Sequence, residues 1–231
     1  MASKIGGSIR VAGAADAAAI AAVHVEAWRE TYVGIVPVQV LAGLSVDRRT
    51  EIWRCILTNP TAFSSSAVFV AERDGTVVGF GCCGMQRAES LNAQGYDGEI
   101  SSIYVLRAFQ RCGLGVTLMS AMGAELQRRR LRAASLWVLR ENESARRFYE
   151  KLGGDIVGDK QDIREDGVVF VEVAYGWRDL GSLAQRARVQ PSGSTPLIGP
   201  DAKITDPPEM SADGTFCPSR SWFKSSRLRQ R

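Results

Sequence analysis

The feature that most constrains the fold is a strand followed by a glycine turn and a helix. Residues 99–105 are typical of a strand, and residues 114–129 carry apolar side chains at helical spacing. The six residues 110–115 between them read Gln-Arg-Cys-Gly-Leu-Gly. Two glycines one residue apart let the backbone turn tightly and let a ligand approach it closely. This order predicts a strand–turn–helix unit that can bind a ligand.

The rest of the chain up to about residue 180 supplies further helices and strands. Helices are expected over the alanine-rich residues 14–29, after Pro37, from Ser45 to about Leu57, and over residues 143–152. Strands are expected near residues 9–11 and 135–139, and as two hairpins that turn at Asp74-Gly75 and Asp166-Gly167. Residues 86–97 form a polar loop with no clear pattern. The order predicts one α/β domain built on a mixed sheet.

Charge and proline divide the chain into two parts. Residues 1–180 carry 21 basic and 21 acidic side chains, whereas residues 181–231 carry eight basic and four acidic ones, which accounts for the whole net charge of +4. Six of the eight prolines also lie after residue 190. We therefore predict a folded domain over residues 8–180 and a disordered, basic tail over residues 181–231. The tail offers a weak site for an anionic partner, nucleic acid included, although a solvated terminus explains it more simply.

Cysteine usage predicts a reducing compartment and no metal site. The five cysteines lie at positions 55, 82, 83, 112 and 217, without metal-ligand spacing, and His24 is the single histidine. Neighbouring Cys82 and Cys83 point to opposite faces if they lie on a strand, so we interpret them as core residues. The sequence shows neither a signal peptide nor a membrane-spanning run, which favours a cytoplasmic protein.

A second glycine cluster, Gly79-Phe80-Gly81-Cys82-Cys83-Gly84, has the spacing of the dinucleotide-binding fingerprint. It falls late in a predicted hairpin strand with no helix after it, so the context that the fingerprint needs is missing. We interpret these glycines as sites of close backbone packing.

The turn at residues 110–115 has the better context. The helix that follows presents unpaired amide N–H groups and the positive end of its dipole, and Arg111 adds a fixed positive charge. A diphosphate fits that position. Taken alone, the motif is also compatible with a simple tight turn between a strand and a helix.

Two motifs together make the pattern specific. Glu-Ile-Ser-Ser-Ile-Tyr-Val at 99–105, followed by the turn at 110–115, resembles the central signature of the GNAT superfamily of N-acetyltransferases. Asn-Glu-Ser-Ala-Arg-Arg-Phe-Tyr-Glu-Lys-Leu-Gly at 142–153 resembles its second signature, in the right order and at the right separation. The resemblance covers roughly residues 9–180, and residues 24–34 are similar to a bacterial branch of the family. It implies a mixed, mostly antiparallel, splayed sheet flanked by helices.

The resemblance also implies a reaction and its residues. Acetyl-CoA would donate an acetyl group to a primary amine that attacks the thioester directly, without an acyl-enzyme. Glu99 would take the proton of the amine and Tyr149 would protonate the departing thiolate. The donor would be bound by a set of residues on the strand, the turn and the second motif: Ile103, Tyr104, Val105, Gln110, Arg111, Cys112, Gly113, Leu114, Gly115, Val116 and Asn142.

Each role has a structural alternative. Glu99 at a strand start is as readily a solvent-facing residue, Tyr149 is a candidate for core packing, and Asn142 can act as a helix cap alone. His24 on an alanine-rich helix is more readily structural than catalytic. Trp28, Tyr32 and Trp53 are candidates to line an acceptor groove or to fill the core.

Three functions compete at this level. The favoured one is acetyl transfer to a small molecule, peptide or protein amine by a cytoplasmic enzyme, for which a homodimer is a possible assembly. The second is a GNAT fold that binds acetyl-CoA as a sensor or docking module without turnover. In the third, the main function lies in the basic tail, which tethers the domain to nucleic acid.

Overall fold

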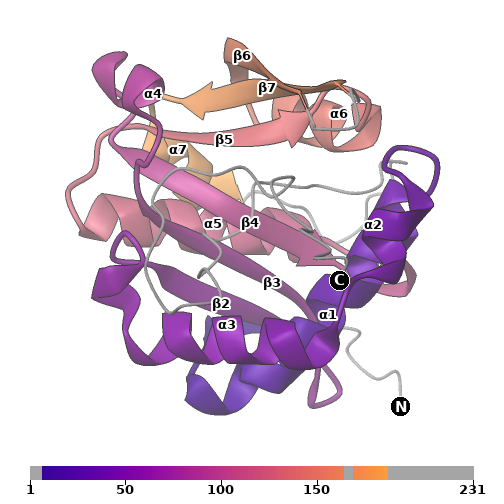
Figure 1. Ribbon diagram of the computed structural model, residues 1–231. Coiled ribbons are helices and arrows are strands. Elements are labelled where there is room, and N and C mark those ends of the chain that lie inside the picture. Colours follow the sequence, from indigo (N-terminus) through magenta and orange to yellow (C-terminus); the bar gives the residue numbers. More distant parts are fainter. Residues whose placement is uncertain (1–6, 164–168, 187–231) are drawn as a thin grey trace.

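The computed structural model describes residues 7–163 and 169–186, and these residues fold around one seven-stranded sheet (Figure 1). The strand order is β1-β2-β3-β4-β5-β7-β6, with β4 and β5 parallel and every other neighbouring pair antiparallel. The mixed, mostly antiparallel sheet predicted from the sequence is confirmed. The strands are β1 Ser8–Val11, β2 Ala67–Arg73, β3 Thr76–Met85, β4 Gly98–Val105, β5 Ala134–Leu139, β6 Asp155–Ile163 and β7 Val169–Trp177.

Helices cover both faces of the sheet. Helices α1 and α3 lie on one face of the β2–β4 region, and α5 lies on the other face with α7 packed against it (Figure 1). The short helix α4 covers the arm formed by β5, β7 and β6 through a small apolar cluster. The helices are α1 Ala17–Tyr32, α2 Val38–Ala42, α3 Val46–Thr58, α4 Glu89–Ala93, α5 Leu114–Arg128, α6 Glu143–Lys151 and α7 Leu180–Gln185, with 3-10 turns at Ala14–Asp16, Pro60–Ala62 and Arg107–Phe109.

Local chemistry explains several of these boundaries. The Ser45 side chain caps α3 by accepting a hydrogen bond from the Arg48 N–H at 3.3 Å. Asp74 and Gly75 both have positive φ, at 51° and 75°, as a tight hairpin turn requires. Cys82 and Cys83 lie in the apolar clusters on opposite faces of β3, as predicted.

The glycine cluster of β3 is packed against neighbouring backbone. A Cβ on Gly79 would lie 2.8 Å from the Tyr104 carbonyl oxygen, and one on Gly84 would lie 2.6 Å from the Ser64 carbonyl oxygen. The interpretation of these glycines as close-packing residues is therefore confirmed.

Two parts of the chain differ from the expectations. Residues 86–97, expected to be an irregular loop, contain the one-turn helix α4, whose Leu91 is buried with Tyr96 and Trp137. At the end of the domain, α7 begins at Leu180 and continues to Gln185, and its Leu183 is buried against α5. Residues 187–231 of the predicted tail and the predicted turn at Asp166-Gly167 lie outside the described residues.

The sheet splits between its two parallel strands. Within the described chain, β4 and β5 pair only at Gly98 with Ala134 and at Glu99 with Ser135. Beyond these two pairs the strands diverge toward the side where α2 lies (Figure 1). The Gln86 side chain holds the closed end, because its Nε2 donates to Ser135 Oγ at 2.6 Å and to the Gly98 carbonyl oxygen at 3.3 Å. The sheet is therefore splayed, as predicted.

A β-bulge interrupts β4 near the point of divergence. The register passes from Cys82 opposite Ser102 to Cys83 opposite Ile100, so Ser101 is the extra residue. Ser102 next to it is fully buried, and its hydroxyl has no hydrogen-bond partner among the described residues. A buried hydroxyl in that state is costly unless a ligand or water satisfies it.

Among the described residues, we find no helix that combines the length and the apolar character needed to cross a bilayer.

Candidate active site

The turn before α5 has the geometry of an anion site. Arg111 and Gly113 both adopt left-handed backbone conformations, with φ of 61° and 87°. They bring the chain into the first turn of α5, where the amide N–H groups of Leu114, Gly115 and Val116 have no carbonyl partner within the helix. Cys112 is exposed in the same turn, and its thiol donates to the Phe109 carbonyl oxygen at 2.8 Å. The turn thus offers backbone N–H groups and a helix dipole to an anionic ligand.

The turn is also tied to the end of β4. The Gln110 Nε2 donates to the Val105 carbonyl oxygen at 2.9 Å. Ile103 faces the apolar cluster that contains α5, whereas the Tyr104 side chain faces α1 and accepts a hydrogen bond from Trp28 Nε1 at 2.9 Å. The side chains of Ile103 and Tyr104 therefore point to the two faces of the sheet. Their backbone forms the edge of β4 that diverges from β5.

The second motif lies beside the first. A Cβ on Gly115 would lie 3.3 Å from the Phe148 ring, a tight contact that shows how closely α5 and α6 approach each other at this glycine. Asn142 caps α6 by accepting from the Ala145 N–H at 3.1 Å. The Asn142 side chain is buried, and its Nδ2 has no hydrogen-bond partner among the described residues. A buried amide that donates nothing is a candidate to bind a ligand carbonyl or hydroxyl.

Tyr149 lies on the buried face of α6. Its ring is fully buried, with Tyr175 at 5.7 Å and Trp177 at 5.9 Å between ring centroids. Burial, with a smaller contribution from Tyr175, holds the pKa of the Tyr149 phenol well above its ordinary value. The phenol is therefore protonated at neutral pH, and its ring belongs to the apolar cluster between α5, α6 and the sheet.

Glu99 is the second residue of β4 and is paired with a residue that the sequence did not single out. Arg87 donates to the Glu99 carboxylate from Nε at 2.8 Å, from Nη2 at 2.6 Å and from its backbone N–H at 3.2 Å. The Glu99 side chain is 5% exposed and that of Arg87 is 26% exposed. Arg87 lies in an irregular segment without a motif, so nothing in the sequence pointed to this pair.

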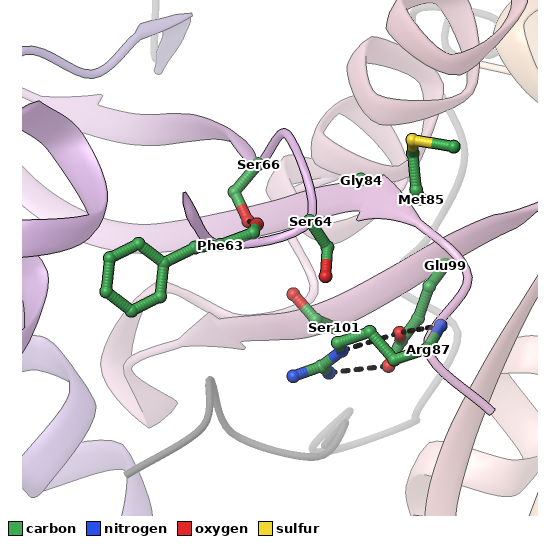
Figure 2. A pocket seen from close by; sticks show the side chains of 8 residues that line it. All are labelled: Phe63, Ser64, Ser66, Gly84, Met85, Arg87, Glu99 and Ser101. Atoms are coloured by element: carbon green, nitrogen blue, oxygen red, sulfur yellow. Dashed lines mark hydrogen bonds and ion pairs between the residues drawn. The ribbon is translucent and has the colours of Figure 1, made fainter. Parts of the chain in front are cut away.

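A small pocket opens above this ion pair (Figure 2). Arg87 and Glu99 lie side by side along one wall, and the hydroxyl-bearing residues Ser64 and Ser101 lie close to them. Ser101 is the bulge residue of β4, so the pocket reaches the distorted part of the strand. The full lining is Phe63, Ser64, Ser66, Gly84, Met85, Arg87, Glu99 and Ser101.

The aromatic residues considered for an acceptor groove belong to the core. Trp28, Tyr32 and Trp53 are all fully buried in the apolar cluster between α1, α3 and the sheet. His24 lies in the same cluster, where its Nδ1 accepts a hydrogen bond from Trp53 Nε1 at 3.1 Å. This supports the structural interpretation of His24. Among the described residues, no three His, Cys, Asp or Glu side chains are grouped so as to hold a metal ion.

Comparison with known proteins identifies the family. The acetyltransferase (GNAT) family model matches residues 27–154. An uncharacterized N-acetyltransferase of Bacillus subtilis, YuaI, is 35% identical over 178 residues, which cover 76% of this chain and 95% of the relative.

Solved structures agree on the fold. The PaiA N-acetyltransferase from Thermoplasma acidophilum, in complex with coenzyme A, superimposes with a TM-score of 0.57 at 18% identity, covering 73% of this chain and 98% of that one. YncA from Salmonella typhimurium, with its cofactor acetyl-CoA, gives a TM-score of 0.57 at 22% identity, covering 75% and 94%. With the family match over both motifs, these findings lead to one conclusion: the chain belongs to the GNAT family of acetyltransferases and is an N-acetyltransferase.

Proposed function

We propose that this enzyme transfers an acetyl group from acetyl-CoA to a primary amine by direct attack in a ternary complex. The observation that carries the proposal is the divergence of β4 from β5 beside the N-terminus of α5 (Figure 1). This arrangement leaves an unpaired strand edge next to a ready-made anion site, and the extended, amide-containing arm and diphosphate of acetyl-CoA require these two features.

The described residues fit this donor. The turn at residues 110–115 and Val116 offer amide N–H groups to the diphosphate, with the charge of Arg111 nearby. The backbone of Ile103, Tyr104 and Val105 offers the strand edge, and the unpartnered Nδ2 of Asn142 offers a donor on the opposite arm of the split. The two solved proteins with coenzyme A or acetyl-CoA share this fold, which supports the choice of donor.

The chemistry follows from Glu99 and Tyr149. The neutral acceptor amine attacks the thioester carbonyl carbon, a C–N bond forms, and the C–S bond breaks with its electron pair going to sulfur. Glu99 accepts the proton that the amine loses, and Tyr149 gives its phenolic proton to the thiolate. A backbone N–H group in the distorted part of β4 around Ser101 would stabilise the developing oxyanion.

Calorimetry with acetyl-CoA, followed by thiol release across a panel of amines, tests the proposal. We expect acetyl-CoA to bind, and we expect turnover with at least one amine. Glu99→Gln and Tyr149→Phe should each reduce the turnover rate by about a hundredfold or more while leaving acetyl-CoA bound. A Tyr149→Phe enzyme with the wild-type rate would remove Tyr149 from the acid role. Binding without turnover of any amine would favour an acetyl-CoA sensor, and lack of acetyl-CoA affinity would overturn the proposal.

A further inference from the structure

Strand β4 carries three side-chain hydroxyls, and two of them are bonded within the fold. Ser101 Oγ donates to the Cys82 carbonyl oxygen at 3.3 Å, and the Tyr104 hydroxyl accepts from Trp28 Nε1 at 2.9 Å. Ser102 lies between them, is 0% exposed, and its Oγ has no hydrogen-bond partner among the described residues. Because an unsatisfied buried hydroxyl is costly, Ser102 is a candidate to bind a ligand.

The Ser102 side chain lies on the face of the sheet that α1 covers. Its partner on β3 is Cys82, and residues directly opposite each other on neighbouring strands point to the same face. Cys82 belongs to the apolar cluster beneath α1 and α3, and so does Tyr104, which is two residues further along β4. The register is regular from Ser102 to Tyr104, so both arguments place the Ser102 hydroxyl on this face.

Glu99 is directed to the same face. Its neighbour Ile100 belongs to the cluster with α5 on the opposite face, and Phe63 of the α1–α3 cluster lines the pocket next to Glu99. A general base has to lie within hydrogen-bond reach of the proton that it takes, directly or through one water. The acceptor amine of the proposed reaction therefore lies on the α1 side of β4, which is also the side of Ser102.

The order of residues along β4 places Ser102 at the reactive end of the donor. In the proposed complex, the diphosphate binds the turn before α5 and the arm lies along the backbone of residues 103–105. An arm that runs in this direction brings its thioester to Ser102, before the bulge and Glu99. In the described chain, the β4–β5 pairing ends at Glu99 with Ser135, so a ligand in the split meets an open strand edge at residue 102.

We infer that Ser102 is a further catalytic residue, whose hydroxyl binds the attacking amine and directs the nitrogen lone pair at the thioester carbonyl carbon. The inference rests on the proposed acetyl transfer and assigns a residue to the acceptor side of that site. A neutral primary amine has two N–H groups besides its lone pair, and Ser102 Oγ accepts a hydrogen bond from one of them. Ser102 itself gains and loses no proton, because Glu99 takes the proton that the nitrogen gives up.

Ser102→Ala tests the inference through activity and stability together. With the best acceptor of the amine panel, kcat/KM from thiol release should fall about tenfold, because a hydrogen bond to the attacking group is lost. Calorimetry should give a Kd for acetyl-CoA within about twofold of the wild-type value, since the hydroxyl contacts the acceptor and not the donor. The Tm of the free enzyme should be unchanged or higher, because alanine removes a buried hydroxyl that the fold does not satisfy.

Two further variants separate hydrogen bonding from packing. Ser102→Cys keeps a side chain of similar shape but replaces the hydroxyl by a weakly hydrogen-bonding thiol, so its loss of kcat/KM should be close to that of Ser102→Ala. Ser120→Ala is the matched control, because Ser120 is also buried but its hydroxyl donates to the Leu183 carbonyl oxygen at 3.0 Å. This control should have a lower Tm and an unchanged kcat/KM.

The outcomes distinguish this inference from the proposed function. Three results would each overturn the inference and leave acetyl transfer standing: an unchanged kcat/KM in Ser102→Ala, a fall in its Tm as large as that of Ser120→Ala, or a loss of acetyl-CoA affinity as large as the loss of kcat/KM. Failure of the wild-type enzyme to bind acetyl-CoA, or to acetylate any amine, would instead count against the proposed function.

Discussion

Asn142 caps a helix and points an unused donor into the interior. Its Oδ1 accepts from the Ala145 N–H, and its Nδ2 is buried without a partner among the described residues. A serine can perform the first role through its hydroxyl but not the second. The two roles can therefore be separated by substitution at a single position.

We expect Asn142→Ser to keep the stability of the fold within about 0.5 kcal/mol and to weaken acetyl-CoA binding several-fold. Asn142→Ala should lower the free energy of unfolding by about 1 kcal/mol as well, because the cap is lost. Urea unfolding and calorimetry measure the two effects. Unchanged acetyl-CoA affinity in Asn142→Ser would show that the amide does not touch the donor.

The buried phenol of Tyr149 should affect how the free energy of unfolding changes at high pH. Its pKa is raised in the folded state by burial, so the folded protein holds the phenolic proton more tightly than the unfolded chain does. The corresponding stabilisation is complete below about pH 10, the ordinary pKa of tyrosine, and is lost as the pH rises toward the folded-state value. The free energy of unfolding should therefore fall above about pH 10, and less steeply in Tyr149→Phe. An identical slope in both proteins would contradict this.

Residues of the site differ in how far the sequence reveals them. Asn142, Gly113 and Gly115 belong to motifs in which local geometry dictates the residue, and their conformations follow from chain-local rules. Arg87 does not, because its role arises from a contact with Glu99 across two strands joined by a loop. Such pairs depend on strand register and on the path of the loop, and neither is encoded in a short pattern.

At the scale of elements, the turn before α5 depends on one left-handed glycine. Gly113 has φ of 87°, a conformation that costs other residues about 1–2 kcal/mol. Gly113→Ala should lower the free energy of unfolding by about that amount and weaken acetyl-CoA binding, since the N–H groups of the turn move. Gly13→Ala is the control, because Gly13 has φ of −116° and open space around it. Urea titration measures the free energy of unfolding of both variants. Equal values would show that the backbone conformation at residue 113 does not disfavour alanine.

Most elements could be predicted because periodicity, caps and turn residues agree with one another. The exception is α4, a single turn with too few residues for a helical period. Its Leu91 is buried against Tyr96 and Trp137, so tertiary packing rather than local propensity stabilises it. The same reasoning applies to α7, where the composition around residue 180 favours a tail but Leu183 finds a site on α5.

At the scale of the whole molecule, α7 extends the packed structure beyond Leu180. Leu183 is 1% exposed, and its carbonyl oxygen accepts a hydrogen bond from Ser120 Oγ at 3.0 Å. Leu183→Ala should cost about 2–5 kcal/mol, whereas Gln185→Ala at an exposed position of the same helix should cost little. A chain ending after residue 180 should lose at least as much stability as Leu183→Ala, relative to one ending after residue 186. Thermal or urea unfolding provides the comparison.

The split between β4 and β5 also bears on how the molecule holds together. Two residue pairs and the Gln86 side chain form the sheet connection between the β1–β4 arm and the β5–β7–β6 arm. An acetyl-CoA molecule that hydrogen-bonds to the edges of both β4 and β5 would bridge the gap between these strands. Its binding free energy is then also folding free energy, amounting to about 2.7 kcal/mol at a hundredfold excess over Kd. Amide hydrogens along both open edges should therefore exchange more slowly as acetyl-CoA is added, so that binding of the co-substrate and closure of the split sheet become one event.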